Sequence, residues 1–115
     1  MPVILYYNTQ CSKSRQALEL LRSRGIEPTI IDYLANPPTH DELVNLLDVL
    51  GMEPRDLMRR EEPEYREANL DDPGLTRETL IRAIVQRPKL LQRPIVIANG
   101  RAVLARPPEK LLEIL

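Results

Sequence analysis

The sequence has few of the residues on which several common classes of protein depend. Its 115 residues contain no Trp, no Phe, one Cys and one His. A single Cys excludes an internal disulfide framework, and one Cys with one His cannot supply the ligands of a structural zinc site. We therefore expect no bound metal. A core without Trp or Phe must consist mainly of Leu, Ile, Val and Ala, which are abundant because 43% of the residues are hydrophobic.

Charge of one sign and long apolar runs are also missing. Sixteen Lys and Arg nearly balance 17 Asp and Glu, which leaves a formal net charge of −1. A protein that neutralises phosphates is usually far more basic, so we expect no nucleic-acid partner. No apolar run approaches the roughly 18–20 residues of a membrane span, and residues 1–7 lack the features of a signal peptide. We expect one soluble, cytoplasmic domain over residues 1–115, because domains most often contain roughly 100–150 residues.

The first third of the chain alternates between strand and helix patterns. Residues 2–7 and 29–33 are short apolar runs rich in β-forming residues. Between them, apolar residues recur at helical spacing from Ser12, and Gly25 follows where a helix commonly ends. This order predicts a β-α-β unit with two parallel strands and a right-handed crossover.

Helix patterns dominate the middle of the chain, and a hairpin pattern follows them. Apolar residues at helical spacing predict helices over 39–51 and 76–86, and short helical pieces are expected between them. Asn99-Gly100 lies between two apolar runs, which is a strong signal for a β-hairpin. A last helix is expected over 109–115. The order of elements predicts an α/β protein of the thioredoxin-like class, with a four-stranded mixed sheet and flanking helices.

Cys11 lies between the first predicted strand and the first predicted helix. Backbone N–H groups are unpaired at a helix N-terminus, and the helix dipole there stabilises an anion. Lys13 and Arg15 add positive charge close by, and neighbours such as Asn8 are polar. We therefore expect the Cys11 thiol to ionise more easily than a free cysteine and to act as a nucleophile. The alternative is a small, inert core residue, which is a common fate for a lone Cys.

Two serines follow Cys11 in the motif Cys-Ser-Lys-Ser. Ser12 and Ser14 could donate hydrogen bonds to an anion at the start of the helix, or could serve only as helix caps. Ser14 occupies the position of the second thiol in a Cys-x-x-Cys motif, so no internal disulfide can form. An oxidised Cys11 must therefore be resolved by an external thiol such as glutathione, through a mixed disulfide.

Three segments of the chain carry motifs that belong together. They are Asn8-Thr9-Gln10-Cys11-Ser12-Lys13-Ser14-Arg15, Gln92-Arg93-Pro94-Ile95-Val96 and Arg106-Pro107-Pro108-Glu109-Lys110, with Arg59 between the first two. In this order and with these separations, the motifs resemble those of the glutaredoxin-coupled arsenate reductase family. The resemblance covers essentially the whole chain. It implies a thioredoxin-like fold with a helical insertion, in agreement with the helix-rich region 39–86.

The resemblance also implies a reaction and a set of site residues. The Cys11 thiolate would attack arsenate, glutathione would add as co-substrate, glutaredoxin would remove it as a mixed disulfide, and arsenite would leave, with no bound cofactor. Arg59, Arg93 and Arg106 would bind the oxyanion, because a guanidinium presents paired donors to such anions. Pro94 would be a cis-proline that faces the thiol.

Two positions depart from the family pattern and keep other functions open. Tyr7 and Thr9 stand where family members commonly have His and Pro. A glutathione-dependent thiol reductase that acts on another substrate is therefore the second hypothesis. A third is a regulator of the same superfamily that binds RNA polymerase, although Ser14 removes the Cys-x-x-Cys switch that such regulators often carry.

Overall fold

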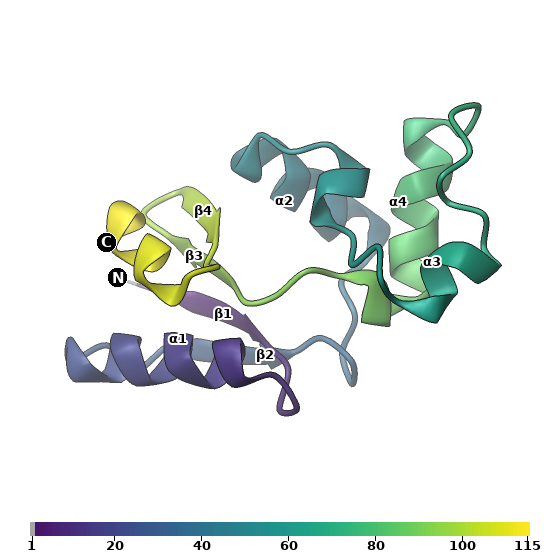
Figure 1. The fold of residues 1–115 in the computed structure, drawn as a ribbon. Coiled ribbons are helices and arrows are strands. Elements are labelled where there is room, and N and C mark those ends of the chain that lie inside the picture. The colour runs from purple at the N-terminus through teal and green to yellow at the C-terminus, as the bar shows by residue number, and fades with distance from the viewer. Residues whose placement is uncertain (1) are drawn as a thin grey trace. The chain divides into compact units, whose positions relative to one another are not determined.

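The structure is a computed structural model that describes residues 2–115. Two compact units are present. The sheet unit contains the N-terminal segment through Asn36 together with Arg93–Leu115, and the helical unit is Pro37–Gln92. In Figure 1 the sheet unit is purple to blue at its start and green to yellow at its end. The expectation of one domain stays a prediction.

The sheet unit contains four strands in the order β2-β1-β3-β4. They are β1 (Ile4–Tyr7), β2 (Thr29–Asp32), β3 (Ile95–Ala98) and β4 (Arg101–Leu104). Strand β1 pairs with β2 in parallel and with β3 antiparallel, and β3 pairs with β4 antiparallel. The predicted mixed four-stranded sheet with flanking helices is confirmed.

One face of this sheet is covered by α1 (Ser12–Ser23) and the 3-10 helix η3 (Pro108–Ile114). The buried side of α1 presents Ala17 and Leu21, which pack with Leu5, Val96 and Leu111. This cluster contains only aliphatic residues at its centre, as the composition requires. Fully burying one such Leu or Val contributes about 1.5–3 kcal/mol to stability, so the cluster fixes α1 against β1. The last helix, predicted over 109–115, is the 3-10 helix η3, which begins and ends one residue earlier.

The turn between β3 and β4 confirms the hairpin prediction. Asn99 and Gly100 have φ values of 57° and 70°, the left-handed conformation that a two-residue hairpin turn requires. The strands pair in register from Ala98↔Arg101 to Ile95↔Leu104. The turn therefore brings the segment after β4 back beside the segment before β3, where Ala105 N donates to Pro94 O over 2.9 Å.

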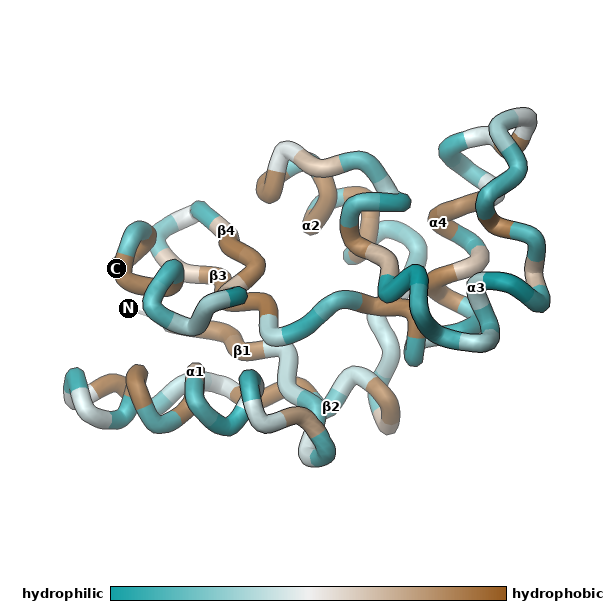
Figure 2. Tube along the Cα trace, in the orientation of Figure 1, coloured by the Kyte–Doolittle hydropathy of each residue, from teal (hydrophilic) through white to brown (hydrophobic). Residues whose placement is uncertain are grey.

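The helical unit contains three α-helices and two short 3-10 helices. They are α2 (His40–Leu50), η1 (Pro54–Leu57), α3 (Pro63–Glu67), α4 (Arg77–Gln86) and η2 (Pro88–Leu90). A capping box starts α2, because the Thr39 side chain accepts from Glu42 N while the Glu42 side chain accepts from Thr39 N. Figure 2 shows apolar residues recurring along α4 between hydrophilic ones. The recurring positions Leu80 and Ile84 are buried, which accounts for the pattern.

Candidate functional site

Cys11 is the N-cap residue of α1, four residues after the end of β1. Its backbone is extended, with φ −106° and ψ 118°, and its carbonyl accepts from Arg15 N over 3.3 Å. The residue is 7% exposed, so it is buried. The predicted position before the first helix is therefore confirmed.

Several hydrogen bonds in which Asn8 donates or accepts stabilise the loop between β1 and α1. Asn8 O accepts from Cys11 N over 3.0 Å, and Asn8 Oδ1 accepts from Gln10 N over 2.9 Å. Asn8 N donates to Ser14 Oγ over 3.3 Å. Asn8 thus joins the end of β1 to the first turn of α1, and Cys11 lies between these fixed points.

Arg15 also stabilises this loop. Its guanidinium donates to Thr9 O over 3.1 Å, on the exposed side of the loop. We predicted Arg15 as a source of positive charge for the thiol. The structure places its guanidinium on a carbonyl of the same loop, so its direct contact is with the backbone.

The electrostatic environment of Cys11 favours the thiolate. Burial by itself raises the pKa of the Cys11 thiol, because it removes water from the charged form. Hydrogen bonds from Ser14 N, the Arg93 side chain, the Ser14 hydroxyl and Lys13 N outweigh burial and lower the pKa to about 7. Lys13 and Ser14 belong to the first turn of α1, where N–H groups have no partner within the helix. At neutral pH about half of such a thiol is ionised.

Arg93 and Arg106 lie beside each other in the sheet unit. Arg106 Nη1 donates to Arg93 O over 3.1 Å, and the Arg93 side chain in turn hydrogen bonds to Cys11. Arg93 Nε is buried and has no hydrogen-bond partner among residues 2–115, so one guanidinium donor is unused. The Arg93–Pro94 peptide bond is cis, as the resemblance implied, and the Arg106–Pro107 bond is also cis. The structure thus places the Arg93 side chain at Cys11 and the Arg106 guanidinium at the Arg93 backbone, whereas the convergence of Arg106 on Cys11 stays a prediction.

Arg59 belongs to the helical unit, and its convergence on Cys11 stays a prediction. It forms an ion pair with Glu62, and a second with Glu61 over 3.6 Å. The Arg59 side chain is 20% exposed, and its Nε is buried without a partner in the described part of the chain. The adjacent Arg60, with side chain 53% exposed, approaches Asp56 over 3.8 Å. Arg59 is thus the more enclosed of the two arginines.

Ser12 and Ser14 have different surroundings. Ser14 is fully buried and hydrogen bonds to the thiol, whereas Ser12 is exposed at the first position of α1. Tyr33, which the sequence analysis did not single out, follows β2 and is fully buried; its hydroxyl accepts from Asn8 Nδ2 over 3.2 Å. The parallel pairing of β1 with β2 explains this contact, because Asn8 and Tyr33 directly follow the paired residues Tyr7 and Asp32.

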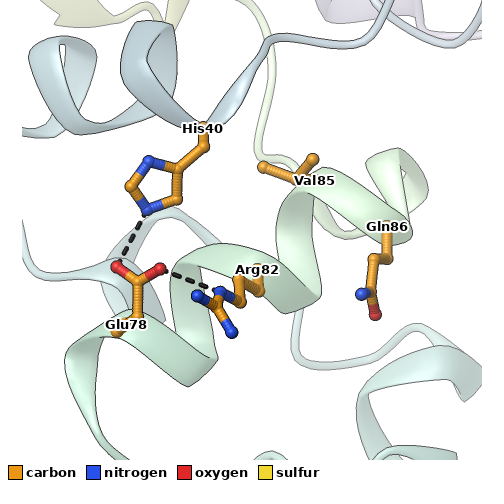
Figure 3. Close-up of a pocket in the computed structure, with 5 residues that line it drawn as sticks. All are labelled: His40, Glu78, Arg82, Val85 and Gln86. Carbon is orange, nitrogen blue, oxygen red and sulfur yellow. Dashed lines mark hydrogen bonds and ion pairs between the residues drawn. The ribbon is translucent and has the colours of Figure 1, made fainter.

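A separate hollow of about 320 Å³ lies in the helical unit, between the N-terminal end of α2 and the side of α4. Figure 3 shows the Glu78 carboxylate between His40 and Arg82. One carboxylate oxygen is 2.8 Å from His40 Nε2, and the other accepts from Arg82 Nε over 2.9 Å. The polar groups of His40, Glu78 and Arg82 are thus paired with each other at this hollow.

Neither a metal site nor a membrane span is found in the described chain. No group of three or more His, Cys, Asp or Glu residues is arranged to hold a metal ion within residues 2–115. Over the same residues, the helices are too short or too polar to cross a bilayer.

Comparison with known proteins identifies the family. The ArsC family model matches residues 6–114, so the chain belongs to the ArsC family. The chain is 50% identical over 113 residues to the uncharacterized protein YfgD of Escherichia coli K12. This alignment covers 97% of this chain and 95% of YfgD. It is 44% identical over 117 residues to an arsenate reductase of Neisseria meningitidis, with both chains fully covered.

Solved structures support the same assignment. The structure of an arsenate reductase from Vibrio cholerae is 47% identical and superposes with a TM-score of 0.97 over 100% of this chain and 98% of that one. The expected family and the thioredoxin-like α/β fold are therefore confirmed.

Proposed function

We propose that this protein is an arsenate reductase that uses Cys11 as its nucleophile and glutathione with glutaredoxin as its reductant. One observation carries the proposal: the Cys11 thiol has a pKa of about 7 and hydrogen bonds to the Arg93 side chain. A thiolate must approach an anion of the same sign, and a guanidinium between them offsets the repulsion. The names of the relatives described above support arsenate as the oxyanion.

The proposed reaction begins with the Cys11 thiolate. It attacks arsenic, an S–As bond forms, and one arsenate oxygen leaves as water after protonation. Glutathione then adds to arsenic through its sulfur, and a second oxygen leaves as water. A glutaredoxin thiolate attacks the glutathione sulfur, which forms a mixed disulfide and leaves two electrons on arsenic. Water finally releases arsenite and restores the Cys11 thiol.

The five predicted anion-binding residues have proposed parts in this reaction. Arg93 stabilises the thiolate and then the oxyanion, for which its unpaired Nε supplies a further donor. Arg106 binds Arg93 O, and we propose that its remaining donors reach the oxyanion. Ser14 donates to the thiolate, Ser12 offers a hydroxyl at the exposed start of α1, and we propose that Arg59 also binds the oxyanion. We place the reaction in the cytoplasm, where glutathione keeps thiols reduced.

The decisive experiment measures arsenite formation by the purified protein with arsenate, glutathione and glutaredoxin, each omitted in turn. We expect arsenite only when all three are present, and none from Cys11→Ser. Arg22→Ala is the matched control, because Arg22 pairs with Glu27 over 3.0 Å on the exposed side of the molecule. Arsenite formation by Cys11→Ser would refute the mechanism. Glutathione addition to Cys11 without arsenite formation would favour a reductase for another substrate.

A further inference from the structure

Asn8 and Tyr33 meet at one edge of the sheet. The parallel register pairs Tyr7 with Asp32, the last residues of β1 and β2, so the next residues in each segment come side by side. Tyr33 is fully buried and Asn8 is 7% exposed. Asn8 Nδ2 donates to the Tyr33 hydroxyl oxygen over 3.2 Å. A buried polar side chain without such a partner would be costly, so this contact stabilises the position of Asn8.

Both ends of the Asn8 amide are hydrogen bonded. Its Nδ2 donates to Tyr33, while its Oδ1 accepts from Gln10 N over 2.9 Å. Reversing the amide would place Nδ2 against the Gln10 N–H, which is donor against donor. The Gln10 N–H therefore selects the orientation of the Asn8 amide, and the Tyr33 hydroxyl holds the side chain in that orientation by accepting from Nδ2. That orientation sets the turn that leads to Cys11, whose N–H donates to Asn8 O over 3.0 Å.

The backbone of Asn8 also orients the hydroxyl next to the thiol. Asn8 N donates to Ser14 Oγ over 3.3 Å, so the Ser14 oxygen acts as an acceptor toward Asn8. Its own hydrogen is then available for the Cys11 thiolate, to which the Ser14 hydroxyl is hydrogen bonded. Moving Asn8 would disturb this bond without touching Cys11 itself.

We infer that Tyr33 is a positioning residue for the Cys11 nucleophile and acts through the Asn8 side chain. The inference rests on the proposed function, because it assumes that Cys11 is the reacting group. Tyr33 does not belong to the segments that carry the family resemblance, and it is 22 positions away from the cysteine in sequence. Its effect on the reaction is to hold the loop so that Ser14 and the first-turn N–H groups face the sulfur.

The test is the pH titration of thiolate absorbance in Tyr33→Phe. Phenylalanine keeps the buried ring and removes only the hydroxyl. We expect the midpoint to rise by about half to one pH unit, a threefold to tenfold change in the ionisation equilibrium. The matched control is Tyr65→Phe in the helical unit, where Tyr65 is also buried and its hydroxyl donates to Asp71 Oδ1 over 2.7 Å. It should change thermal stability without moving the midpoint.

A double-mutant cycle tests whether Tyr33 acts through Asn8. Asn8→Ala should raise the midpoint by at least as much as Tyr33→Phe, and the double variant should rise no further than Asn8→Ala alone. Additive shifts, or an unchanged midpoint in Tyr33→Phe, would overturn the inference. If Tyr33→Phe does not fold, an unchanged midpoint in Asn8→Ala overturns it equally. The titration needs no arsenate, so a protein that shows these shifts but forms no arsenite would refute the proposed function alone.

Discussion

Replacing Arg93 with Ala should raise the pKa of the Cys11 thiol clearly above its value of about 7. A hydrogen bond to a charged group contributes about 1.5–3 kcal/mol, which equals about one to two pKa units. Arg93 is half-buried, and solvent screens part of its interaction, so we expect the lower end, about one unit. The ionised fraction at neutral pH would then fall from about half to about one tenth.

The assay is thiolate absorbance against pH, together with the rate at which an alkylating reagent modifies Cys11 at neutral pH. Arg93→Lys should recover only part of the shift, because an ammonium cannot reproduce the planar fork of a guanidinium. Arg22→Ala should leave both readings unchanged, since Arg22 pairs with exposed Glu27. Arsenite formation should fall at least as far as the thiolate fraction, because Arg93 also contacts the oxyanion in the proposed mechanism.

Two results would refute this reasoning. A midpoint at or above about 8.5 in the unmodified protein would mean that burial dominates and that Cys11 is an inert core residue. An unchanged midpoint in Arg93→Ala would assign the lowered pKa to the N–H groups of Lys13 and Ser14 alone. The N-terminus of α1 would then be sufficient to lower the pKa of Cys11, and Arg93 would act only on the substrate.

Other side chains make separate, measurable contributions. Peroxide followed by glutathione should add one glutathione to Cys11, the only cysteine in the chain, and an unmodified intact mass of the folded protein would exclude glutathione as the resolving thiol. Glu62→Gln should lower the KM for arsenate about twofold to fivefold, because it removes the nearer of the two carboxylates that pair with Arg59, and an unchanged KM would place Arg59 outside the anion site. The contact with Glu78 raises the pKa of His40. The contribution of the His40–Glu78 contact to the free energy of unfolding should therefore be complete below about pH 6.5 and be lost as the pH rises through the raised pKa of His40. His40→Gln should abolish this pH dependence of stability.

Local signals in the sequence were sufficient for much of the fold. Asn99-Gly100 specifies its hairpin because the turn needs two residues with positive φ, and Thr39 with Glu42 specifies the start of α2 through bonds between near neighbours. The place of Cys11 before α1 follows from the same kind of local pattern. Each of these features depends on a few consecutive residues, so no knowledge of the tertiary structure is needed.

The contacts around the thiol depend on strand register, which the sequence pattern does not determine. The bond from Asn8 to Tyr33 exists because β1 and β2 pair in one particular alignment, and a shift by one residue would remove it. The bond from Arg106 to Arg93 O likewise requires the β3–β4 hairpin to bring the two flanking segments together. The family resemblance predicted Arg93 and Arg106 as site residues, but it could not indicate that Arg106 binds the backbone carbonyl of Arg93.

These contacts change how oxyanion binding should be understood in the proposed mechanism. Each of the three arginines already has an acceptor: Arg93 has the Cys11 sulfur, Arg106 has a carbonyl oxygen, and Arg59 has the Glu62 carboxylate. Binding of arsenate therefore uses the free donors of these guanidinium groups, such as Arg93 Nε, and exchanges acceptors at the occupied ones. The exchanged part of its free energy is a difference between two sets of hydrogen bonds. A neutral carbonyl is a weaker competitor than a carboxylate, because hydrogen bonds between charged partners are about twice as strong. Arg106 should accordingly turn toward the anion most readily, and Arg59 should contribute least until Glu62 is displaced.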